Sequence, residues 1–394
     1  MSEHIMPTYR RLPLRFARGE GSYLYTDEGE AYLDFVSGIA VMTLGHGDPR
    51  LVSALQNQAE QLWHVSNLFT IPEQEALADL LCANSFADLI FFCNSGTEAV
   101  EGVIKTARKY HSSHGAPERY KIITFSGCFH GRTLGALAAT GNRDYLEGFG
   151  PPLPGFIQLP LGDSAAVRRA VDCETAAIII EPVQGEGGVS VAGAGFLRDL
   201  RQIADEHGIL LIFDEVQCGM GRTGTLFAHQ QCDVTPDLMA IAKGLGSGFP
   251  VGAFLATRDA AQGMVAGSHG STFGGNPLAM TVARTVVETV LAPGFLENVN
   301  EKGSRFSQGL AALVDQFPDI IDEVRGMGLM RGLHCVVDKA RFVDALRAQH
   351  MLCVAAGDNV VRLLPPLTVS EDDLSRALTC IEAACLALRE AGAA

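Results

Sequence analysis

The chain has 394 residues, of which 47% are hydrophobic and 19% charged, and its formal net charge is −15 at pH 7. This length is enough to bury one large hydrophobic core and a second, smaller one. The negative charge comes without any sustained cluster of Lys and Arg, which argues against nucleic acid and anionic membrane surfaces as partners and favours small-molecule substrates.

Cysteine usage and the absence of targeting signals indicate the compartment. Ten cysteines stand singly, without C-x-x-C spacing, and Cys93, Cys173 and Cys335 lie in apolar stretches. This pattern predicts reduced structural thiols in a cytosol, with neither a disulfide framework nor a zinc site. No apolar run approaches the length of a membrane span, and residues 1–7 contain no signal-peptide core. We therefore expect a cytoplasmic protein without a bound metal.

The N-terminal segment is predicted to begin with strands. Residues 21–26 and 30–35 flank Asp27-Glu28-Gly29, which is typical of a hairpin because Gly tolerates the positive φ of a tight turn. Asp48 and Pro49 then supply the N-cap and first turn of a helix. The apolar face of this helix is predicted to carry Leu51, Leu55, Ala59 and Leu62.

From about residue 88, short apolar runs alternate with helical patterns, as a parallel sheet requires. An amphipathic helix over residues 196–204 is predicted to end at Gly208. After Pro277, a long helical stretch leads to a last α+β region. The predicted strands are residues 89–93, 121–125, 176–180, 209–213, 238–242 and 253–256.

The order of these elements predicts an α/β fold with two domains. A large domain over residues 49–290 holds the mostly parallel sheet. A smaller α+β domain covers residues 291–394, and the N-terminal segment, residues 1–48, is expected to pack with it.

Two ionisable residues stand at the ends of predicted strands. Asp214 follows the run 209–213, and Lys243 follows the run 238–242. Ligands of open α/β sheets bind at the carboxyl edge of the strands, so this carboxylate and this amine form a candidate active-site couple. A pyridoxal 5′-phosphate (PLP) enzyme needs such a couple: the lysine forms a Schiff base with the cofactor, and the aspartate partners the pyridinium nitrogen.

Two glycine-bearing segments could bind phosphate. Residues 93–99 lie between a predicted strand and a predicted helix, which suits a phosphate cradle, although an isolated match of this kind is more often a simple Ser or Thr N-cap without a ligand. Residues 219–224 match G-x-G-x-x-G and keep a nicotinamide-dependent dehydrogenase as an alternative. The second match is expected to be a decoy, because no helix long enough to face a pyrophosphate follows it.

A longer set of motifs resembles the class III PLP-dependent aminotransferases and covers nearly the whole chain in the family's order. These segments are residues 94–99, 129–133, 181–188, 213–228, 236–237, 243–246, 250–256, 271–277 and 361–366. Within the family, the chain is most similar to the members that act on acetylornithine. The resemblance implies fold type I of the PLP-dependent transferases, PLP as cofactor, a homodimer and a ping-pong reaction.

The resemblance implies a role for each residue around the cofactor. Lys243 is similar to the Schiff-base lysine, whose amine then moves the proton between substrate and cofactor, and Asp214 to the partner of the ring nitrogen. Gln217 resembles the residue that hydrogen-bonds the ring hydroxyl, while Val216 and Phe129 would clasp the faces of the ring. The remaining cofactor positions bind the phosphate: Ser95, Gly96, Thr97 and, from the neighbouring subunit, Thr272.

The resemblance also implies how substrates are chosen. Arg132 and Arg362 are similar to the residues that bind substrate carboxylates, and Ser271 to one that lines the neighbouring subunit's part of the pocket. Glu186 stands where related ornithine enzymes carry a glutamate that pairs with the arginine matching Arg362. Ile39 replaces a tyrosine that in those enzymes helps hold a free α-amino acid end, and an apolar residue there suits an acylated amine.

The expected reaction is the transfer of the terminal amino group of N2-acetylornithine to 2-oxoglutarate, which gives glutamate, in arginine biosynthesis. Succinylornithine, succinyldiaminopimelate, ornithine and 4-aminobutyrate are alternative amino donors. A glutamate-semialdehyde aminomutase and a non-catalytic PLP-binding regulator also remain open as alternatives.

Overall fold

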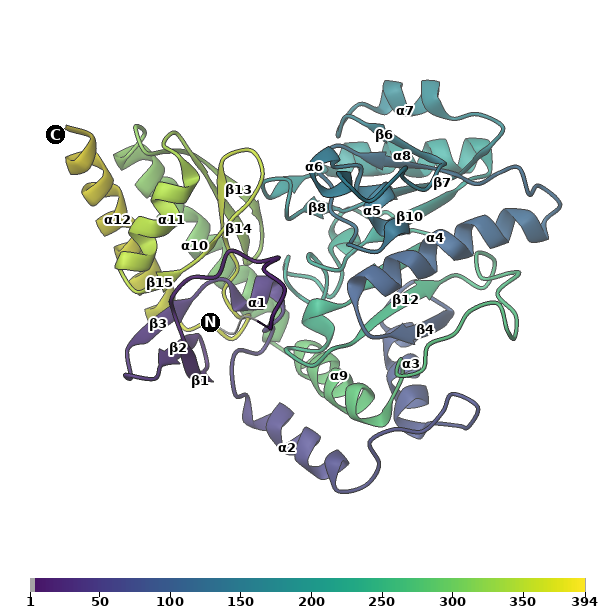
Figure 1. Ribbon diagram of the computed structural model, residues 1–394, viewed down its shortest axis with the longest axis horizontal. Helices are drawn as coiled ribbons and strands as arrows, with labels where there is room; N and C mark the ends of the chain where they lie inside the picture. The colour runs from purple at the N-terminus through teal and green to yellow at the C-terminus, as the bar shows by residue number, and fades with distance from the viewer. Residues whose placement is uncertain (1–3, 394) are drawn as a thin grey trace.

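A seven-stranded sheet forms the centre of the larger lobe of the computed structural model, which describes residues 4–393 (Figure 1). In sheet order, the strands are β4 (Leu89–Cys93), β12 (Gly252–Ala256), β11 (Leu238–Ile241), β10 (Leu210–Asp214), β7 (Thr175–Ile180), β5 (Lys121–Phe125) and β6 (Phe156–Leu159). Only β12 runs antiparallel to its neighbours. The predicted mostly parallel α/β sheet is therefore confirmed, and β6 is a strand that the sequence did not predict.

Helices pack on both faces of this sheet, because alternate residues of each strand point to opposite sides. In β10, Leu211 and Phe213 belong to one hydrophobic cluster, and Leu210 and Ile212 belong to another. The first cluster contains residues of α2 (Pro49–Ala59), α3 (Pro72–Ala83), α7 (Ser164–Ala170), α8 (Ala194–His207) and α9 (Pro277–Val290). The second contains residues of α4 (Gly96–Ser113) and α5 (Leu134–Thr140).

The predicted start of α2 and the predicted end of α8 are confirmed, but the predicted end of α2 is wrong. The side chain of Asp48 accepts a hydrogen bond from the backbone N–H of Arg50 at the start of α2, and Gly208, with φ of 59°, ends α8. Helix α2 ends at Ala59, however, so Leu62 lies beyond it and is 47% exposed. The prediction that Leu62 continues the apolar face is therefore wrong.

The smaller lobe joins the two ends of the chain. One sheet contains β13 (Ile321–Met327), β14 (Met330–Cys335), β17 (Val360–Leu363) and β16 (Val354–Ala355), and its helices are α10 (Phe295–Gln316), α11 (Lys339–Ala348) and α12 (Glu371–Ala393). A second sheet contains β1 (Phe16–Glu20), β2 (Tyr23–Thr26), β3 (Ala31–Asp34) and β15 (Met351–Leu352). The predicted hairpin is confirmed, since β2 and β3 pair antiparallel.

The N-terminal segment packs with the C-terminal part of the chain. Strand β3 pairs parallel with β15, and Leu33 and Phe35 share a hydrophobic cluster with Phe306 of α10. The domain boundaries at residues 48 and 290 stay a prediction, and residues 1–3 and 394 of those domains lie outside the described residues. The short elements that complete the fold are α1 (Ser37–Ala40), α6 (Arg143–Leu146), β8 (Val183–Gln184), β9 (Ser190–Val191) and the 3₁₀ turns η1 (Ala228–Gln231) and η2 (Lys243–Leu245).

All ten cysteines are unpaired, but they differ in exposure. Cys93 and Cys335 are buried, whereas Cys173 is exposed. The prediction of an apolar setting is wrong for Cys173, because it lies between α7 and β7 with Asp172 and Glu174 on either side. Within residues 4–393, no single helix is long and apolar enough to cross a membrane; α9 and α10 meet that test only as a pair, which is bent by 69°.

Candidate active site

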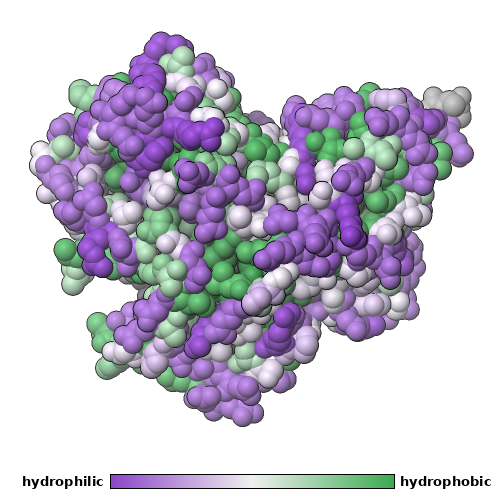
Figure 2. Space-filling view, turned by 180° about the vertical axis from the view of Figure 1, so that it is seen from behind, coloured by the Kyte–Doolittle hydropathy of each residue, from purple (hydrophilic) through white to green (hydrophobic). Residues whose placement is uncertain are grey.

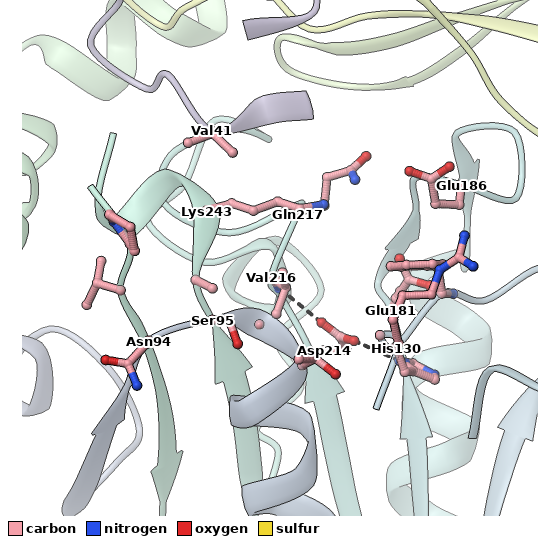
Figure 3. Close-up of a pocket in the computed structure, with 18 of the residues that line it drawn as sticks. Val41, Asn94, Ser95, His130, Glu181, Glu186, Asp214, Val216, Gln217 and Lys243 are labelled. Carbon is pink, nitrogen blue, oxygen red and sulfur yellow. Dashed lines mark hydrogen bonds and ion pairs between the residues drawn. The ribbon is translucent and has the colours of Figure 1, made fainter. Parts of the chain in front are cut away.

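A cavity of about 360 Å³ lies at the carboxyl ends of β4, β5, β10 and β11 (Figure 3). This is the edge at which open α/β sheets bind their ligands. The predicted site residues that line it are Ser95, Gly96, Thr97, Phe129, Arg132, Glu186, Asp214, Val216, Gln217 and Lys243. Five segments that are separate in sequence thus converge on one cavity.

Asp214 is held in a fixed orientation at the end of β10. Its Oδ1 accepts a hydrogen bond from the backbone N–H of Val216 at 3.0 Å, and its Oδ2 lies 2.7 Å from Nδ1 of His130 (Figure 3). The carboxylate is only 3% exposed. A buried carboxylate with both oxygens engaged is suited to pair with one cationic group of a ligand.

His130 is a site residue that the sequence did not predict. It lines the cavity and is fully buried, and its Nε2 has no hydrogen-bond partner within the described residues. Burial opposes a charge on the imidazole, but the acidic groups of Cys128 and Asp214 raise the pKa of His130 well above its ordinary value. The available signal was its place next to Phe129, inside a motif already assigned to the site.

Lys243 supplies the amine of the cavity. It follows β11, which pairs in parallel with β10, so the amine and the Asp214 carboxylate are delivered by adjacent strands. Burial lowers the pKa of the Lys243 amine, although the charge of Glu186 opposes that shift. A lowered pKa increases the fraction of neutral amine, which is the form that can accept a proton or attack a carbonyl.

The start of α4 fits an anion. Ser95 caps this helix by accepting the backbone N–H of Glu98, and Gly96 and Thr97 form its first turn against the cavity. A Cβ atom on Gly96 would lie 2.6 Å from Cγ1 of Val216, so only glycine allows this close approach. The positive end of a helix macrodipole favours a phosphate there. The N-cap is therefore present, and the phosphate cradle, which is compatible with it, stays a prediction.

An ion pair between a buried arginine and a partly exposed glutamate lies at one side of the cavity. Nη1 of Arg362 is 2.8 Å from Oε1 of Glu186 and donates a hydrogen bond to Oε1 of Gln217 at 3.0 Å. The Arg362 side chain is 1% exposed, whereas Glu186 is 30% exposed. Arg362 does not line the cavity itself, so Glu186 stands between the arginine and the space that a substrate would occupy.

Arg132 has no ion-pair partner among the described residues. Its guanidinium lies 3.8 Å from the ring centroid of Tyr145 and 5.6 Å from that of Phe129. Stacking of this kind holds a guanidinium flat and leaves its donors available for a carboxylate. The backbone N–H of Phe129 donates to Oε1 of Glu181, a buried carboxyl that the sequence did not assign to the site, and burial raises the pKa of Glu181 to about 7.

Four predicted site residues do not line the cavity of this chain: Arg362, described above, and Ile39, Thr272 and Ser271. Ile39 is 37% exposed and lies two residues before Val41, which does line the cavity. Thr272 is exposed. Ser271 accepts a hydrogen bond from Nδ2 of Asn94, a cavity residue, at 3.2 Å. The predicted roles of Ser271 and Thr272 involve a neighbouring subunit and stay predictions.

The G-x-G-x-x-G match at residues 219–224 leads into no helix that could face a pyrophosphate. The next helical element, η1, is a 3₁₀ turn of four residues. Arg222 instead donates through Nη1 to the backbone carbonyl of Leu329 at 3.2 Å, which ties this loop to the small lobe. The segment is therefore a structural loop, as the sequence predicted.

Comparison with known proteins decides the family. The family model of the class-III aminotransferases matches residues 5–385. The chain belongs to the class-III aminotransferase family. Aminotransferases of this class use PLP, so PLP is the cofactor of this enzyme, and the cavity residues fit it: a buried amine, a buried carboxylate and a glycine-bearing helix start. The resemblance predicted from the sequence is confirmed, and the dehydrogenase alternative is excluded.

Individual class-III aminotransferases match along the full chain. Acetylornithine aminotransferase 1 of Bradyrhizobium diazoefficiens is 57% identical over 98% of this chain and 95% of that protein. The solved structure of N-acetylornithine aminotransferase from Stenotrophomonas maltophilia is 38% identical, with a TM-score of 0.86, and covers 97% of this chain and 98% of that one. An amine transaminase from an uncultivated Pseudomonas species, solved in the PLP-bound form, is 29% identical, with a TM-score of 0.91. The match covers 98% of this chain and 99% of that one.

Proposed function

We propose that the enzyme transfers the terminal amino group of N2-acetyl-L-ornithine to 2-oxoglutarate, giving N-acetyl-L-glutamate 5-semialdehyde and L-glutamate. The observation that carries this proposal is the 57% identity to an acetylornithine aminotransferase over 98% of the chain. The cavity agrees with it, because it combines a buried amine with one exposed arginine, Arg132, for a substrate carboxylate.

The residues of the chain divide the work around the cofactor. When bound, PLP supplies an electron sink that stabilises negative charge on the substrate carbon. Lys243 holds or releases a proton at Nζ, first as base and then as acid, for which its lowered pKa is suited. Asp214 would keep the ring nitrogen charged by pairing with it, and His130 and the backbone of Val216 keep Asp214 oriented. Gln217 and Phe129 would help to hold the ring, Gln217 by a hydrogen bond and Phe129 by contact with its face.

The ion pair between Glu186 and Arg362 explains how one cavity can accept two different amino donors, acetylornithine and glutamate. Acetylornithine reacts through its terminal amine, whereas glutamate reacts through its α-amine and brings a carboxylate close to the reacting carbon. The ion pair at 2.8 Å neutralises Arg362 when no such carboxylate is present. Release of Glu186, which is 30% exposed, would free the guanidinium for glutamate.

Glu186→Ala should therefore shift the balance between the two half-reactions. Without the Glu186 carboxylate, the rate of the glutamate half-reaction should rise roughly tenfold relative to that of the acetylornithine half-reaction. This factor corresponds to the usual contribution of one charge-assisted hydrogen bond. Single-turnover absorbance changes of the bound cofactor measure both rates. Glu186→Gln, which keeps the size but loses the charge, should shift the ratio in the same direction. An unchanged ratio would contradict the masking role.

A panel of amino donors tests the proposed function itself. With 2-oxoglutarate as acceptor, kcat/KM should be higher for acetylornithine than for ornithine, succinylornithine or 4-aminobutyrate. The reason is that Ile39 offers no partner to a free α-ammonium group, whose desolvation is costly. Equal or greater kcat/KM for ornithine would overturn this argument. Turnover without any 2-oxo acid would instead indicate an aminomutase.

We further propose a cytoplasmic homodimer whose two active sites are shared. Trp63, Leu68, Phe69 and Phe273 expose large apolar side chains, and the ring of Phe273 contacts His64 at 5.3 Å. Apolar surface that is exposed and contiguous is typical of a protein interface. Figure 2 shows apolar surface gathered in the middle of one face of the molecule. Thr272 belongs to the same segment as Phe273, which supports its role at the partner's phosphate.

Mixing two inactive variants tests the shared site. A Lys243→Ala subunit lacks the amine, and a Thr272→Asp subunit would repel the phosphate of its partner's site. In a hybrid dimer, one site would combine the intact Lys243 of one subunit with the intact Thr272 of the other. Random mixing should therefore restore about a quarter of wild-type activity. Activity that stays at the level of the separate variants would contradict shared sites, and sedimentation of the wild type checks the dimer.

A further inference from the structure

One side-chain pair closes the loop between β3 and α2. Asp34, at the end of β3, is 1% exposed. Its Oδ1 accepts hydrogen bonds from the backbone N–H groups of Val36 and Ser37, each at 2.9 Å, and its Oδ2 lies 2.8 Å from Nε2 of His46. The same carboxylate thus holds the beginning and the end of the loop.

The backbone inside this loop turns in the left-handed sense over α1. The φ angles of Ser37, Gly38, Ile39 and Ala40 are 48°, 63°, 67° and 60°. Only glycine adopts this region without steric cost, and for a β-branched residue such as Ile39 it is a true outlier. A strained turn of this kind persists only where surrounding contacts hold it in place.

The turn leads directly into the wall of the cavity. Val41, which follows it, lines the same cavity as Lys243 (Figure 3). Two hydrogen bonds tie the loop to the segment after Lys243: Oγ1 of Thr43 donates to the carbonyl of Gly244 at 2.9 Å, and the backbone N–H of Leu44 donates to Oγ of Ser247 at 3.0 Å. A shift of the turn would therefore change the position of Val41 in the cavity wall.

His46 is fitted closely into its place. A Cβ atom on Gly19 of β1 would lie 2.7 Å from Cβ of His46, so the strand accommodates the histidine only because it has a glycine there. The backbone of His46 also exchanges two hydrogen bonds of 2.9 Å with Gly21. The imidazole is thus presented to Asp34 by a rigid strand pair.

We propose that Asp34 and His46 are positioning residues for recognition of the amino donor. Their hydrogen bond holds the left-handed turn, and the turn sets the position of Val41 in the wall of the cavity that receives the acylated amino donor. Neither residue lines the cavity, so both act through the turn. The inference rests on the proposed function, because it assigns these residues to the acetylornithine half-reaction.

The test compares His46→Leu with His46→Gln, whose amide Nε2 can still donate to Asp34. His46→Leu should raise KM for acetylornithine about tenfold, which is less than the roughly 10²-fold loss that a misplacement of about 1 Å can cause. KM for 2-oxoglutarate, which is held by arginines and has no acyl group, should stay close to wild type, as should the visible absorbance of bound PLP. His46→Gln should resemble wild type in all three. An unchanged KM for acetylornithine in His46→Leu, or an equal rise in both KM values, would overturn the proposal.

A second variant tests whether the pair acts by holding a strained turn. Ser37→Gly places glycine at a φ of 48°, so it removes strain without touching Ile39 or Val41. In the His46→Leu background it should recover part of the lost affinity for acetylornithine, and no recovery would overturn the strain argument. Failure of the proposed function would appear in the wild-type donor panel, whereas failure of this inference would appear only in the variants.

Discussion

Replacing Lys243 with alanine should lower the rate of amino transfer by at least about 10⁴-fold, because one residue supplies both the nucleophilic amine and the proton carrier. No other lysine lines the cavity within the described residues. The visible absorbance of the bound cofactor should also shift toward that of free PLP, since the covalent link to Nζ is lost. Steady-state rates with acetylornithine and 2-oxoglutarate, together with the spectrum, measure both effects.

Lys302→Ala is the matched control for this variant. Burial also lowers the pKa of the Lys302 amine, but this residue lies on α10, outside the cavity. It should therefore keep the wild-type rate and spectrum. Added small primary amines should raise the rate of Lys243→Ala, because a base from solution can replace the missing one. A Lys243→Ala enzyme that keeps about a tenth of wild-type activity would contradict the assignment.

Residues that follow predicted strands could be located from the sequence alone. Asp214 and Lys243 end apolar runs, and the carboxyl ends of neighbouring parallel strands must meet at one edge of the sheet. The same rule brings Gly96 and Thr97 after β4 to that edge. A local pattern was enough to locate these residues, because residues at the carboxyl ends of neighbouring parallel strands lie close together even when they are far apart in sequence.

Other features depend on contacts that no local pattern encodes. His130 matters because the loop after β5 brings its ring to Asp214, a residue 84 positions away. Val41 reaches the cavity through a left-handed turn that Ile39, as a β-branched residue, disfavours. The antiparallel direction of β12 could not be predicted from the sequence either. A short apolar run such as residues 253–256 has the same composition in a parallel and an antiparallel strand.

The burial of Arg362 shows a further limit of the sequence. Its resemblance to a carboxylate-binding arginine was visible, but its 1% exposure and its bond to Gln217 were not. These contacts arise because β17 of the small lobe meets the loop after β10 of the large lobe. The geometry links the residue predicted to hold the cofactor ring to the residue predicted to hold the substrate, so changes at either position should affect both.

Asp214→Asn should lower kcat/KM for acetylornithine by roughly 10²- to 10³-fold, the usual effect of removing a preorganised charge from an active site. The amide keeps the shape of the carboxylate and can still accept the backbone N–H of Val216. What it loses is the negative charge that holds a proton on the ring nitrogen of PLP. The measurement is kcat/KM together with the dissociation constant for PLP.

Two comparisons separate the charge of Asp214 from its role in packing. Asp205→Asn makes the same chemical change at an exposed ion pair with Arg201, where such pairs contribute little, and should leave kcat/KM unchanged. Asp214→Ala removes both the charge and the two hydrogen bonds to His130 and Val216. If charge dominates, the alanine variant should be only slightly slower than the asparagine variant. If instead Asp214→Asn retains near-wild-type kcat/KM while Asp214→Ala loses it, Asp214 would act by orienting its neighbours, and its pairing with the ring nitrogen would be wrong.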